Sequence, residues 1–216
     1  MFQRALRTVM RAGMQNCPGG GFGLFRRPTG QNKVFLTFDA GPDPIKTPKI
    51  LSALVDQGST ATFFVTGSAA CRHTSLLREL ASEGMEVGNH TWNHWDAKRT
   101  SGYAWWRDYL ACQVWLEQTL QQSVKWFRPP FGRIPTCPAF SRACSLRRLA
   151  FWSHDPKDFL MRDEAAWREW LAGYQPVDGD IILLHDTTAI TARHLKLLLE
   201  RIQGSGFSTG SLSCMA

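Results

Sequence analysis

An aspartate ends the most regular apolar stretch of this sequence. Residues 34–38 are Val-Phe-Leu-Thr-Phe, which is typical of a buried strand, and Asp39 follows them directly, before Ala40-Gly41-Pro42. A strand fixes the position of a carboxylate, and a Gly-Pro turn leaves open space above it. Taken alone, Asp-x-Gly-Pro is more simply explained as an ordinary turn. Four later segments favour a functional role.

Two histidines, His90 and His94, lie four residues apart after a predicted strand at residues 85–87. On one helical turn they would share a face and could both bind a metal such as Zn²⁺. A single His-x-x-x-His is weak support for a metal site. Its position after a strand, like that of Asp39, strengthens the interpretation.

Two more chemical groups stand at predicted strand ends. Arg128 precedes Pro129-Pro130-Phe131-Gly132, and an arginine there can hold a carboxylate through paired hydrogen bonds. The rigid Pro-Pro turn could aim a following N–H at a developing oxyanion. His185 follows the apolar residues 181–184, and it could act as a general acid if a carboxylate raised its pKa. The structural alternatives are an arginine that reaches solvent and a satisfied core histidine.

Short apolar strands alternate with helices about seven times. We expect strands over residues 33–38, 61–65, 85–87, 124–128, 150–152, 181–184 and 206–212. We expect helices over 47–57, 74–83, 102–122, 139–149, 163–172 and 191–203. The first helix should have Thr47 as its N-cap and bury Ile50, Leu51, Leu54 and Val55. This order predicts a parallel sheet closed into a (β/α) barrel, with the active site at the carboxyl ends of the strands.

The 216 residues, 44% of them hydrophobic, fit one domain with a sizeable core. We expect that domain over residues 33–216, preceded by an N-terminal segment and a loop over residues 1–32. The net charge is +7, but the lysines and arginines are dispersed, so we expect no nucleic-acid partner. The six scattered cysteines are expected to be mostly reduced thiols.

Residues 1–14 are basic and have apolar residues at helical spacing. The favoured interpretation is a short helix packed on the domain, and the alternative is a weak contact with an anionic membrane surface. No apolar core with a cleavage site follows this segment. We therefore expect a cytoplasmic protein, with peripheral association at the inner membrane as the alternative.

Taken in order, five segments of the chain resemble the NodB-type polysaccharide deacetylases, carbohydrate esterase family four. The matching segments are Thr37-Phe38-Asp39-Ala40-Gly41-Pro42, His90-Thr91-Trp92-Asn93-His94, Arg128-Pro129-Pro130-Phe131-Gly132, Asp155-Pro156-Lys157-Asp158-Phe159 and Leu183-Leu184-His185. The resemblance covers about residues 34–186. It implies a distorted (β/α) barrel of about seven strands and hydrolysis of N-acetyl groups on N-acetylglucosamine-containing oligosaccharides or polysaccharides.

The resemblance also implies catalytic roles. Asp39 looks like the general base that activates a metal-bound water, oriented by Arg128. The backbone N–H of Phe131 would stabilise the oxyanion. His185 would be the general acid for the leaving amine, steered by Asp158.

The same resemblance implies a metal and a substrate pocket. His90 and His94 would be ligands of a divalent metal, most often zinc, with cobalt or manganese as alternatives. Phe159 and Leu183 would line the pocket around the acetyl methyl, and Trp152 is assigned to substrate binding with them.

One departure from the family pattern affects the metal. The family has a second aspartate in its first motif, the third metal ligand, and this chain has Ala40 there. Two neutral imidazoles alone make a poor site, so we expect weakened affinity. Three interpretations follow: an engineered substitution; a natural protein that still binds metal through His90, His94 and waters, helped by Asp39 or Asp43; or a protein that has lost catalysis and kept sugar binding.

Because the other catalytic positions all remain, we favour a deacetylase acting on an acetylated oligosaccharide or on a lipid-linked or nucleotide-linked sugar. The alternative is a catalytically inactive carbohydrate-binding homologue, which Ala40 motivates. A basic nucleic-acid binder is the weakest hypothesis, because it rests on net charge alone.

Overall fold

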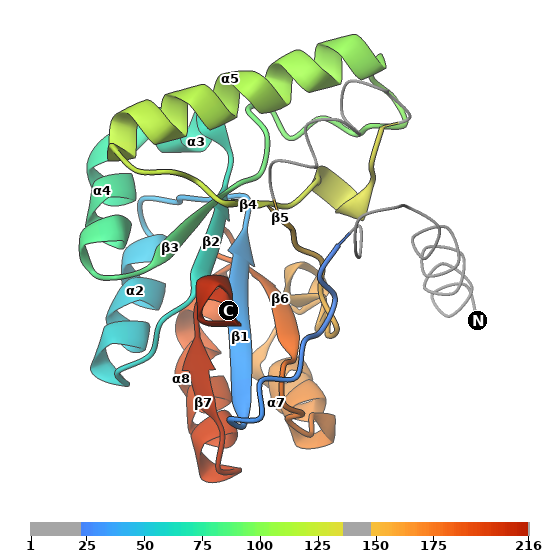
Figure 1. Cartoon of the computed structure of the whole chain (residues 1–216). Helices are drawn as coiled ribbons and strands as arrows, with labels where there is room; N and C mark the ends of the chain where they lie inside the picture. The colour runs from blue at the N-terminus through green and yellow to red at the C-terminus, as the bar shows by residue number, and fades with distance from the viewer. Residues whose placement is uncertain (1–22, 136–147, 216) are drawn as a thin grey trace.

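A curled, parallel, seven-stranded sheet forms the centre of the molecule (Figure 1). The computed structural model describes residues 23–135 and 148–215. The strands lie in the order β5-β4-β3-β2-β1-β6, and β7 pairs with β1. Their bounds are β1 Lys33–Asp39, β2 Thr62–Val65, β3 Glu86–Asn89, β4 Trp126–Phe127, β5 Arg148–Leu149, β6 Ile181–His185 and β7 Ser208–Gly210. The expected distorted (β/α) barrel of about seven strands is confirmed.

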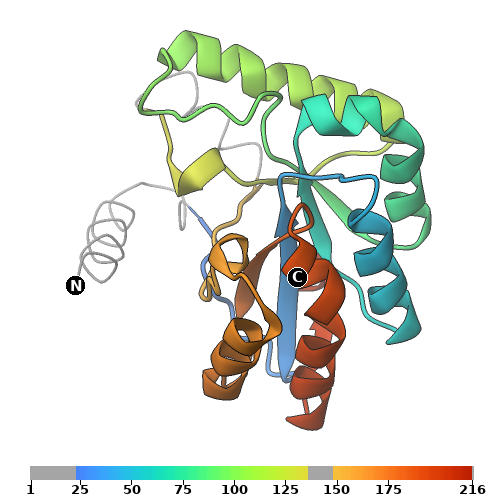
Figure 2. The same ribbon diagram turned by 180° about the vertical axis from the view of Figure 1, so that it is seen from behind.

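Helices cover the outside of this sheet (Figures 1 and 2). The α-helices are α2 Thr47–Asp56, α3 Gly67–Arg72, α4 Thr74–Ser82, α5 Gly102–Leu120, α7 Glu164–Gly173 and α8 Ala189–Gly204. Short 3₁₀ turns are η1 Pro130–Gly132, η2 Asp158–Leu160 and η3 Leu212–Met215. Helix α5 crosses one end of the sheet, whereas α2 and α8 pack together along it. None of these helices combines the length and the apolar character needed to cross a bilayer.

The central strand is apolar because both of its faces are covered. Residues 34–38 of β1 have no exposed surface, and they pack with α2 and α8 in the main core cluster or with the smaller cluster around Phe35 and Phe64. A strand buried on both faces reads as a continuous apolar run rather than an alternation. The run therefore identifies the strand that carries Asp39 to the end of the sheet.

The edges β5 and β6 are joined by segments outside the named strands. Leu24 bridges to Ala150, Arg26 to Asp180, and His154 to Ile182. The Asp180 side chain is fully buried there, and it binds Arg26, His154 and the Ser153 hydroxyl. This seam closes the curled sheet.

Several local expectations are wrong. Thr47 is not the N-cap of α2, because Lys46 holds that position and the Thr47 hydroxyl instead donates to Asp186 at 2.7 Å. Val55 is 45% exposed rather than buried. Helix α3 was not expected, since its six residues are too few to show a period.

The region around β5 also differs from expectation. Residues 148–149 form a strand and not the end of a helix, because they pair with β4. The rest of that expected helix, residues 139–147, lies outside the described residues, as does the expected helix over 1–14.

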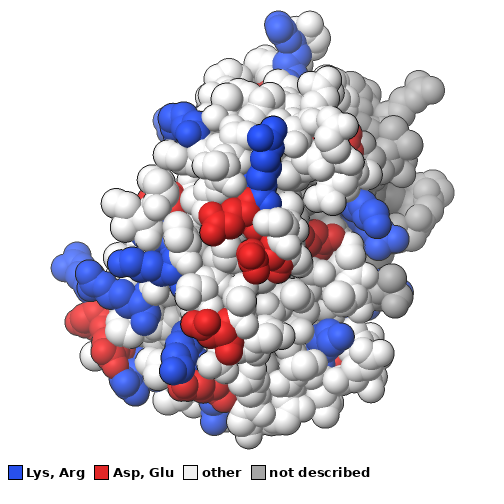
Figure 3. All heavy atoms as spheres, turned by 90° about the vertical axis from the view of Figure 1, so that its left-hand side faces the viewer, with Lys and Arg blue, Asp and Glu red and all other residues white. Residues whose placement is uncertain are grey.

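Charge is mixed in sign on the face that Figure 3 shows. Lysine and arginine side chains are interspersed there with aspartate and glutamate. Such a face lacks the single-sign character of a nucleic-acid footprint.

The contacts of Asp180 with Arg26 and His154, which form this seam, lead to a prediction about stability. Asp180→Ala should lower the free energy of unfolding by about 3 kcal/mol, because it removes the buried carboxylate that Arg26 and His154 contact. Urea unfolding followed by circular dichroism measures this. Glu164→Ala, which breaks an exposed ion pair with Arg168, is the control and should cost less than about 1 kcal/mol. Equal effects of the two variants would contradict the role of the seam.

Candidate active site

Strand register brings four candidate residues to one end of the sheet. Asp39 ends β1 and His185 ends β6, and the two are direct partners across these strands. His90 follows β3, and Arg128 follows β4. All four lie at carboxyl ends of parallel strands, where α/β folds place their active sites.

Arg128 fixes the carboxylate of Asp39. One of its Nη1 hydrogen bonds goes to Asp39 Oδ1 and the other to the Thr37 hydroxyl, both at 2.8 Å. Its Nε donates to the Ala150 carbonyl at 3.2 Å, and its Nη2 to the Phe151 carbonyl at 2.7 Å. The side chain is fully buried. Arg128 is therefore a structural clamp on Asp39 and not an arginine that reaches solvent.

His90 and His94 meet across a loop rather than on a helical turn, so the expected helical turn is wrong. Thr91 and His94 have positive φ values of 66° and 59°, which a helix does not allow. The two rings nevertheless lie 4.8 Å apart. His90 Nδ1 is 2.7 Å from the Arg128 carbonyl, so Nδ1–H donates to it and Nε2 keeps its lone pair. That Nε2 atom is 3.6 Å from Asp39 Oδ2.

Two buried polar residues hold this loop, and the sequence analysis missed both. Asn89 Oδ1 accepts the Thr91 N–H at 2.7 Å. Asp108 Oδ2 accepts the N–H groups of Trp92 and Asn93, each at 3.0 Å. Asp108 lies within α5 and is 5% exposed. A carboxylate buried within a helix is rare without partners, but its burial could not be seen in the sequence.

The two imidazoles are held in the form that binds cations. Burial lowers the pKa of His90 to about 4, and burial also lowers the pKa of His94. Neutral imidazoles are metal ligands, and the hydrogen bond at Nδ1 of His90 is the usual support for such a ligand. These two residues fit a divalent cation.

No third donor side chain joins His90 and His94 among the described residues. Within residues 23–135 and 148–215, no three side chains of histidine, cysteine, aspartate or glutamate converge as a metal site. Asp43 was expected as a possible additional metal ligand. Its carboxylate instead accepts from the Ile45 and Lys46 N–H groups and pairs with Lys46 Nζ at 2.6 Å. The donor set fits a weak site and not a complete one.

Ala40 occupies a backbone conformation that suits other residues better. Its φ is +75°, and its N–H donates to the Phe64 carbonyl at 3.1 Å. The left-handed region costs a β-carbon residue about 1 kcal/mol, and aspartate and asparagine enter it more readily than alanine. The conformation is therefore suited to the aspartate of the family pattern.

His185 is held by Asp158. His185 Nδ1 is 2.7 Å from Asp158 Oδ1, and the His185 backbone N–H donates to Oδ2 at 2.8 Å. The hydroxyls of Thr188 and Thr191 also donate to Oδ2. Burial lowers the pKa of His185, but the hydrogen bond and charge of Asp158 outweigh it, so the pKa is raised. The two threonines were not identified from the sequence.

Exposed aromatic side chains flank the histidines. Phe131 is 57% exposed, and its ring lies 4.8 Å from that of His94. Phe159 is 54% exposed, and its ring lies 5.2 Å from that of His185. Both stand in 3₁₀ turns, Phe131 in η1 and Phe159 in η2. They form an apolar rim around the polar centre.

Two other predicted pocket residues lie deeper. Trp152 is partly buried, its ring lies 5.6 Å from Arg128 Cζ, and a β-carbon added at Gly132 would lie 2.9 Å from that ring. Leu183 is 5% exposed on β6 and pairs with Thr37. Trp152 thus supports the Arg128 clamp from one side.

A second unpredicted carboxylate, Asp186, lies beneath the first motif. Its Oδ2 accepts from Thr47, and a β-carbon at Gly41 would lie 1.9 Å from that oxygen, so only glycine fits there. Its buried Oδ1 has no partner among the described residues. Burial raises the pKa of Asp186 to about 7.

The sequence and the fold of this chain are similar to those of known proteins. A family model described as polysaccharide deacetylase matches residues 26–139. A chitooligosaccharide deacetylase of Sinorhizobium fredii is 33% identical over 183 residues, covering 84% of this chain and 77% of that protein. A peptidoglycan-N-acetylglucosamine deacetylase of Bacillus cereus is 32% identical over 168 residues, covering 77% and 78%. The structure of the peptidoglycan deacetylase PdaC from Bacillus subtilis superposes with a TM-score of 0.78 at 29% identity, covering 88% and 92%.

Asp186 gives a pH prediction. The pKa of Asp186 is raised in the folded state. Its contribution to the free energy of unfolding should therefore be present at low pH and be lost as pH rises through about 7. Between about pH 5.5 and about pH 8 the free energy of unfolding should fall by about 2 kcal/mol more in the wild type than in Asp186→Asn. Denaturant unfolding at both pH values measures this, with exposed Asp56→Asn as control. An identical pH dependence of wild type and Asp186→Asn would contradict it.

Proposed function

The chain belongs to the polysaccharide deacetylase family, and from this premise we propose that it hydrolyses N-acetyl groups on an N-acetylglucosamine-containing oligosaccharide or polysaccharide. One observation carries the proposal. A carboxylate clamped by Arg128 and an imidazole clamped by Asp158 stand on paired residues at the ends of adjacent strands. The named activities of the relatives support the substrate class.

Asp39 is the general base in this proposal. Its Oδ1 accepts from Arg128, which leaves Oδ2 to accept a proton from an attacking water. Arg128 fixes the direction of that oxygen, since its other hydrogen bonds go to the buried groups of Thr37, Ala150 and Phe151. The water then forms the new C–O bond to the acetyl carbon.

His185 is the general acid. Its Nδ1 is held by Asp158, so Nε2–H is the proton that it can donate to the nitrogen of the leaving amine. The C–N bond breaks, the sugar amine takes this proton, and acetate is released. The raised pKa keeps a larger fraction of His185 protonated near neutral pH.

The oxyanion donor is the Phe131 backbone N–H. The N–H groups of Gly132 and Arg133 already donate to the carbonyls of Pro129 and Pro130. The turn η1 therefore holds the neighbouring Phe131 N–H in a fixed direction beside His94. Exposed Phe131 and Phe159 would contact the apolar faces of the sugar.

We assign His90 and His94 as the protein ligands of a divalent metal, for which zinc suits the imidazole donors best and cobalt or manganese are alternatives. When bound, such an ion would polarise the acetyl carbonyl as a Lewis acid. Ala40 supplies no donor, so we expect weak affinity. The neutral state of both imidazoles supports the assignment.

Ala40 also favours a second candidate function, a carbohydrate-binding protein without turnover. In this candidate function, the aromatic rim would still bind a sugar, but no acetyl group would be hydrolysed. It predicts saturable sugar binding, no acetate release and no rescue by Ala40→Asp.

The metal-site prediction concerns Ala40→Asp. The new carboxylate should tighten Zn²⁺ binding at least tenfold, because it adds an anionic ligand in a backbone conformation that suits it. Calorimetry with Zn²⁺ measures affinity, and acetate release from N-acetylated chitooligosaccharides measures activity at limiting metal. Ala40→Gly is the control, since it relieves the left-handed backbone without adding a ligand.

The outcomes separate the two candidates. Activity in both wild type and Ala40→Asp would mean that two histidines suffice. Activity in Ala40→Asp alone would mean a deacetylase scaffold with a disabled metal site. No acetate from either variant, together with sugar binding by calorimetry, would favour the binding protein.

A second prediction concerns the general acid. Asp158→Asn should lower the pKa of His185, since the hydrogen bond and charge of Asp158 raise it. The alkaline limb of kcat/KM should move to lower pH, and kcat should fall about 100-fold. Asp155→Asn is the comparison variant: Asp155 accepts from the Lys157 N–H and raises the pKa of His185 through its charge alone, so its loss should lower that pKa less than Asp158→Asn does. The pH profile is measured on whichever of wild type or Ala40→Asp is active, and an unchanged profile would rule out the assigned role.

A further inference from the structure

Exposed apolar side chains gather at the carboxyl ends of the strands, around the candidate active site. The segments that follow β1 and β3 and the turns η1 and η2 each contribute at least one of them: Ile45, Trp95, Phe131, Phe159 and Leu160. The turn η2 belongs to this end because Asp158 bonds His185 at the end of β6. Single exposed apolar residues are common on protein surfaces, whereas a group of them around one site marks an interaction surface.

Two of these side chains have no role in the proposed chemistry. Ile45 and Leu160 are 66% and 64% exposed, more than any other aliphatic side chain among the described residues. Phe131 and Phe159 can stack on a sugar ring, but an aliphatic side chain has no aromatic face for such stacking. The exposure of Ile45 and Leu160 therefore indicates a partner other than a sugar.

The backbone that presents these two side chains is held in place. Asp43 Oδ1 accepts the Ile45 N–H at 2.9 Å, in the loop between β1 and α2. The Leu160 N–H donates to the Lys157 carbonyl at 2.8 Å in η2. A pre-formed apolar surface lowers the ordering cost of binding.

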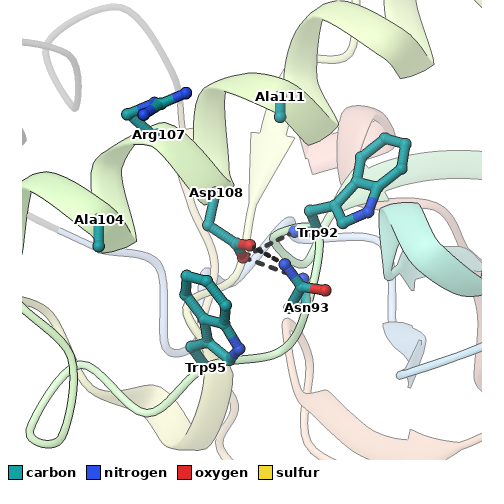
Figure 4. Close-up of a pocket in the computed structure, with 7 residues that line it drawn as sticks. All are labelled: Trp92, Asn93, Trp95, Ala104, Arg107, Asp108 and Ala111. Carbon is teal, nitrogen blue, oxygen red and sulfur yellow. Dashed lines mark hydrogen bonds between the residues drawn. The ribbon is translucent and has the colours of Figure 1, made fainter.

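Trp95 adds an amphipathic ring to the same end of the molecule. Its indole is exposed, and Figure 4 shows Asp108 on α5 holding the neighbouring residues Trp92 and Asn93. Tryptophan is enriched at membrane–water interfaces, because one part of its ring system is apolar and its N–H is polar. An exposed tryptophan on a fixed loop suits such an interface.

Unpaired cations lie on these segments. Lys98, Arg99 and Lys157 are exposed, and none of them forms an ion pair with another described residue. The whole chain carries a net charge of +7. Lysine and arginine side chains near an apolar surface attract anionic lipid headgroups.

The carboxylates of the same segments do not cancel this charge. Asp43 pairs with Lys46, and Asp96 pairs with Arg133. Asp158 is buried against His185. The exposed surface around the site is therefore apolar and cationic, which complements an anionic lipid surface.

We propose that the end of the molecule that carries the active site docks on an anionic lipid surface, with Ile45 and Leu160 entering the interface. The lysines and Arg99 supply the attraction to the headgroups, and the apolar side chains supply the buried area. This inference goes beyond the proposed function, because lipid binding needs no hydrolysis. A site that opens onto a lipid surface would act on a saccharide held there.

Sedimentation of the full chain with vesicles tests the apolar contribution. The wild type should bind vesicles of phosphatidylcholine and phosphatidylglycerol at least tenfold more tightly than vesicles of phosphatidylcholine alone. Ile45→Ser with Leu160→Ser should weaken binding to the mixed vesicles about tenfold, because less apolar area is buried. Val55→Ser with Val177→Ser is the matched control and should bind like the wild type. Both valines are 45% exposed and precede strands, β2 and β6, so they lie toward the opposite end of the sheet.

A second pair of variants tests the cations. Lys98→Gln with Lys157→Gln should weaken binding to the mixed vesicles about tenfold and leave binding to phosphatidylcholine unchanged. Lys125→Gln with Lys196→Gln has the same net charge and removes two exposed lysines outside these segments. This control should change vesicle affinity less than about twofold.

Three results would overturn the inference: no binding to vesicles, equal binding to both kinds of vesicle, or wild-type binding by the variant with Ile45→Ser and Leu160→Ser. The last result would place the contact elsewhere, for example on the basic residues 1–14. Self-association in ultracentrifugation that the same variant abolishes, without vesicle binding, would identify a second copy of the chain as the partner and would also overturn it.

This measurement is independent of acetate release. Vesicle binding by a chain that hydrolyses no saccharide would support the lipid surface and count only against the deacetylase. Hydrolysis without vesicle binding would overturn the lipid surface alone.

Discussion

The ion pair between Asp39 and Arg128 is the interaction on which the rest of the site depends. The Arg128 side chain has no exposed surface, and an unpaired charge that is buried to this extent would be strongly destabilising. Because the guanidinium also bonds Thr37 and the carbonyls of Ala150 and Phe151, the pair joins β1 to the end of β4 and to the chain that leaves β5. The same side chain therefore fixes the Asp39 carboxylate and ties β1 to the segments that follow β4 and β5.

Each further chemical group is held by a buried partner in the same manner. The carbonyl of Arg128 fixes the tautomer of His90, Asp158 fixes that of His185, and Asp108 fixes the loop between His90 and His94. These supports are protein groups that need no metal to form. The proposed acid, the proposed base and the imidazoles are thus each held in place by other protein groups, and such a fixed geometry is the pre-organisation that catalysis requires.

Some features of this site can be predicted from the sequence, and others depend on contacts that form only in the folded protein. The apolar runs that end on Asp39 and His185 predicted β1 and β6 and the polar residues at their ends. Such strands can be recognised because a strand buried on both faces is a continuous apolar stretch. The supports Asp108 and Asp186 were not visible, since a buried carboxylate and an exposed one look alike until the fold is known. The helical turn expected for His90 and His94 was wrong because the spacing of four also arises in a loop with left-handed residues.

The alanine at residue 40 affects the proposed metal site and leaves the proposed acid and base untouched. The spacing of the motifs in the sequence does not make this distinction. The proposed general base, Asp39, and the proposed general acid, His185, need no ligand at residue 40, and each is held by a buried partner. The proposed metal site would need a third donor, and Ala40 supplies none. The backbone at Ala40 keeps a positive φ of 75°, a conformation that costs alanine free energy and that aspartate adopts more readily. The backbone at residue 40 therefore suits an aspartate, and under the proposed function the difference from a three-ligand site is confined to one side chain and does not extend into the fold.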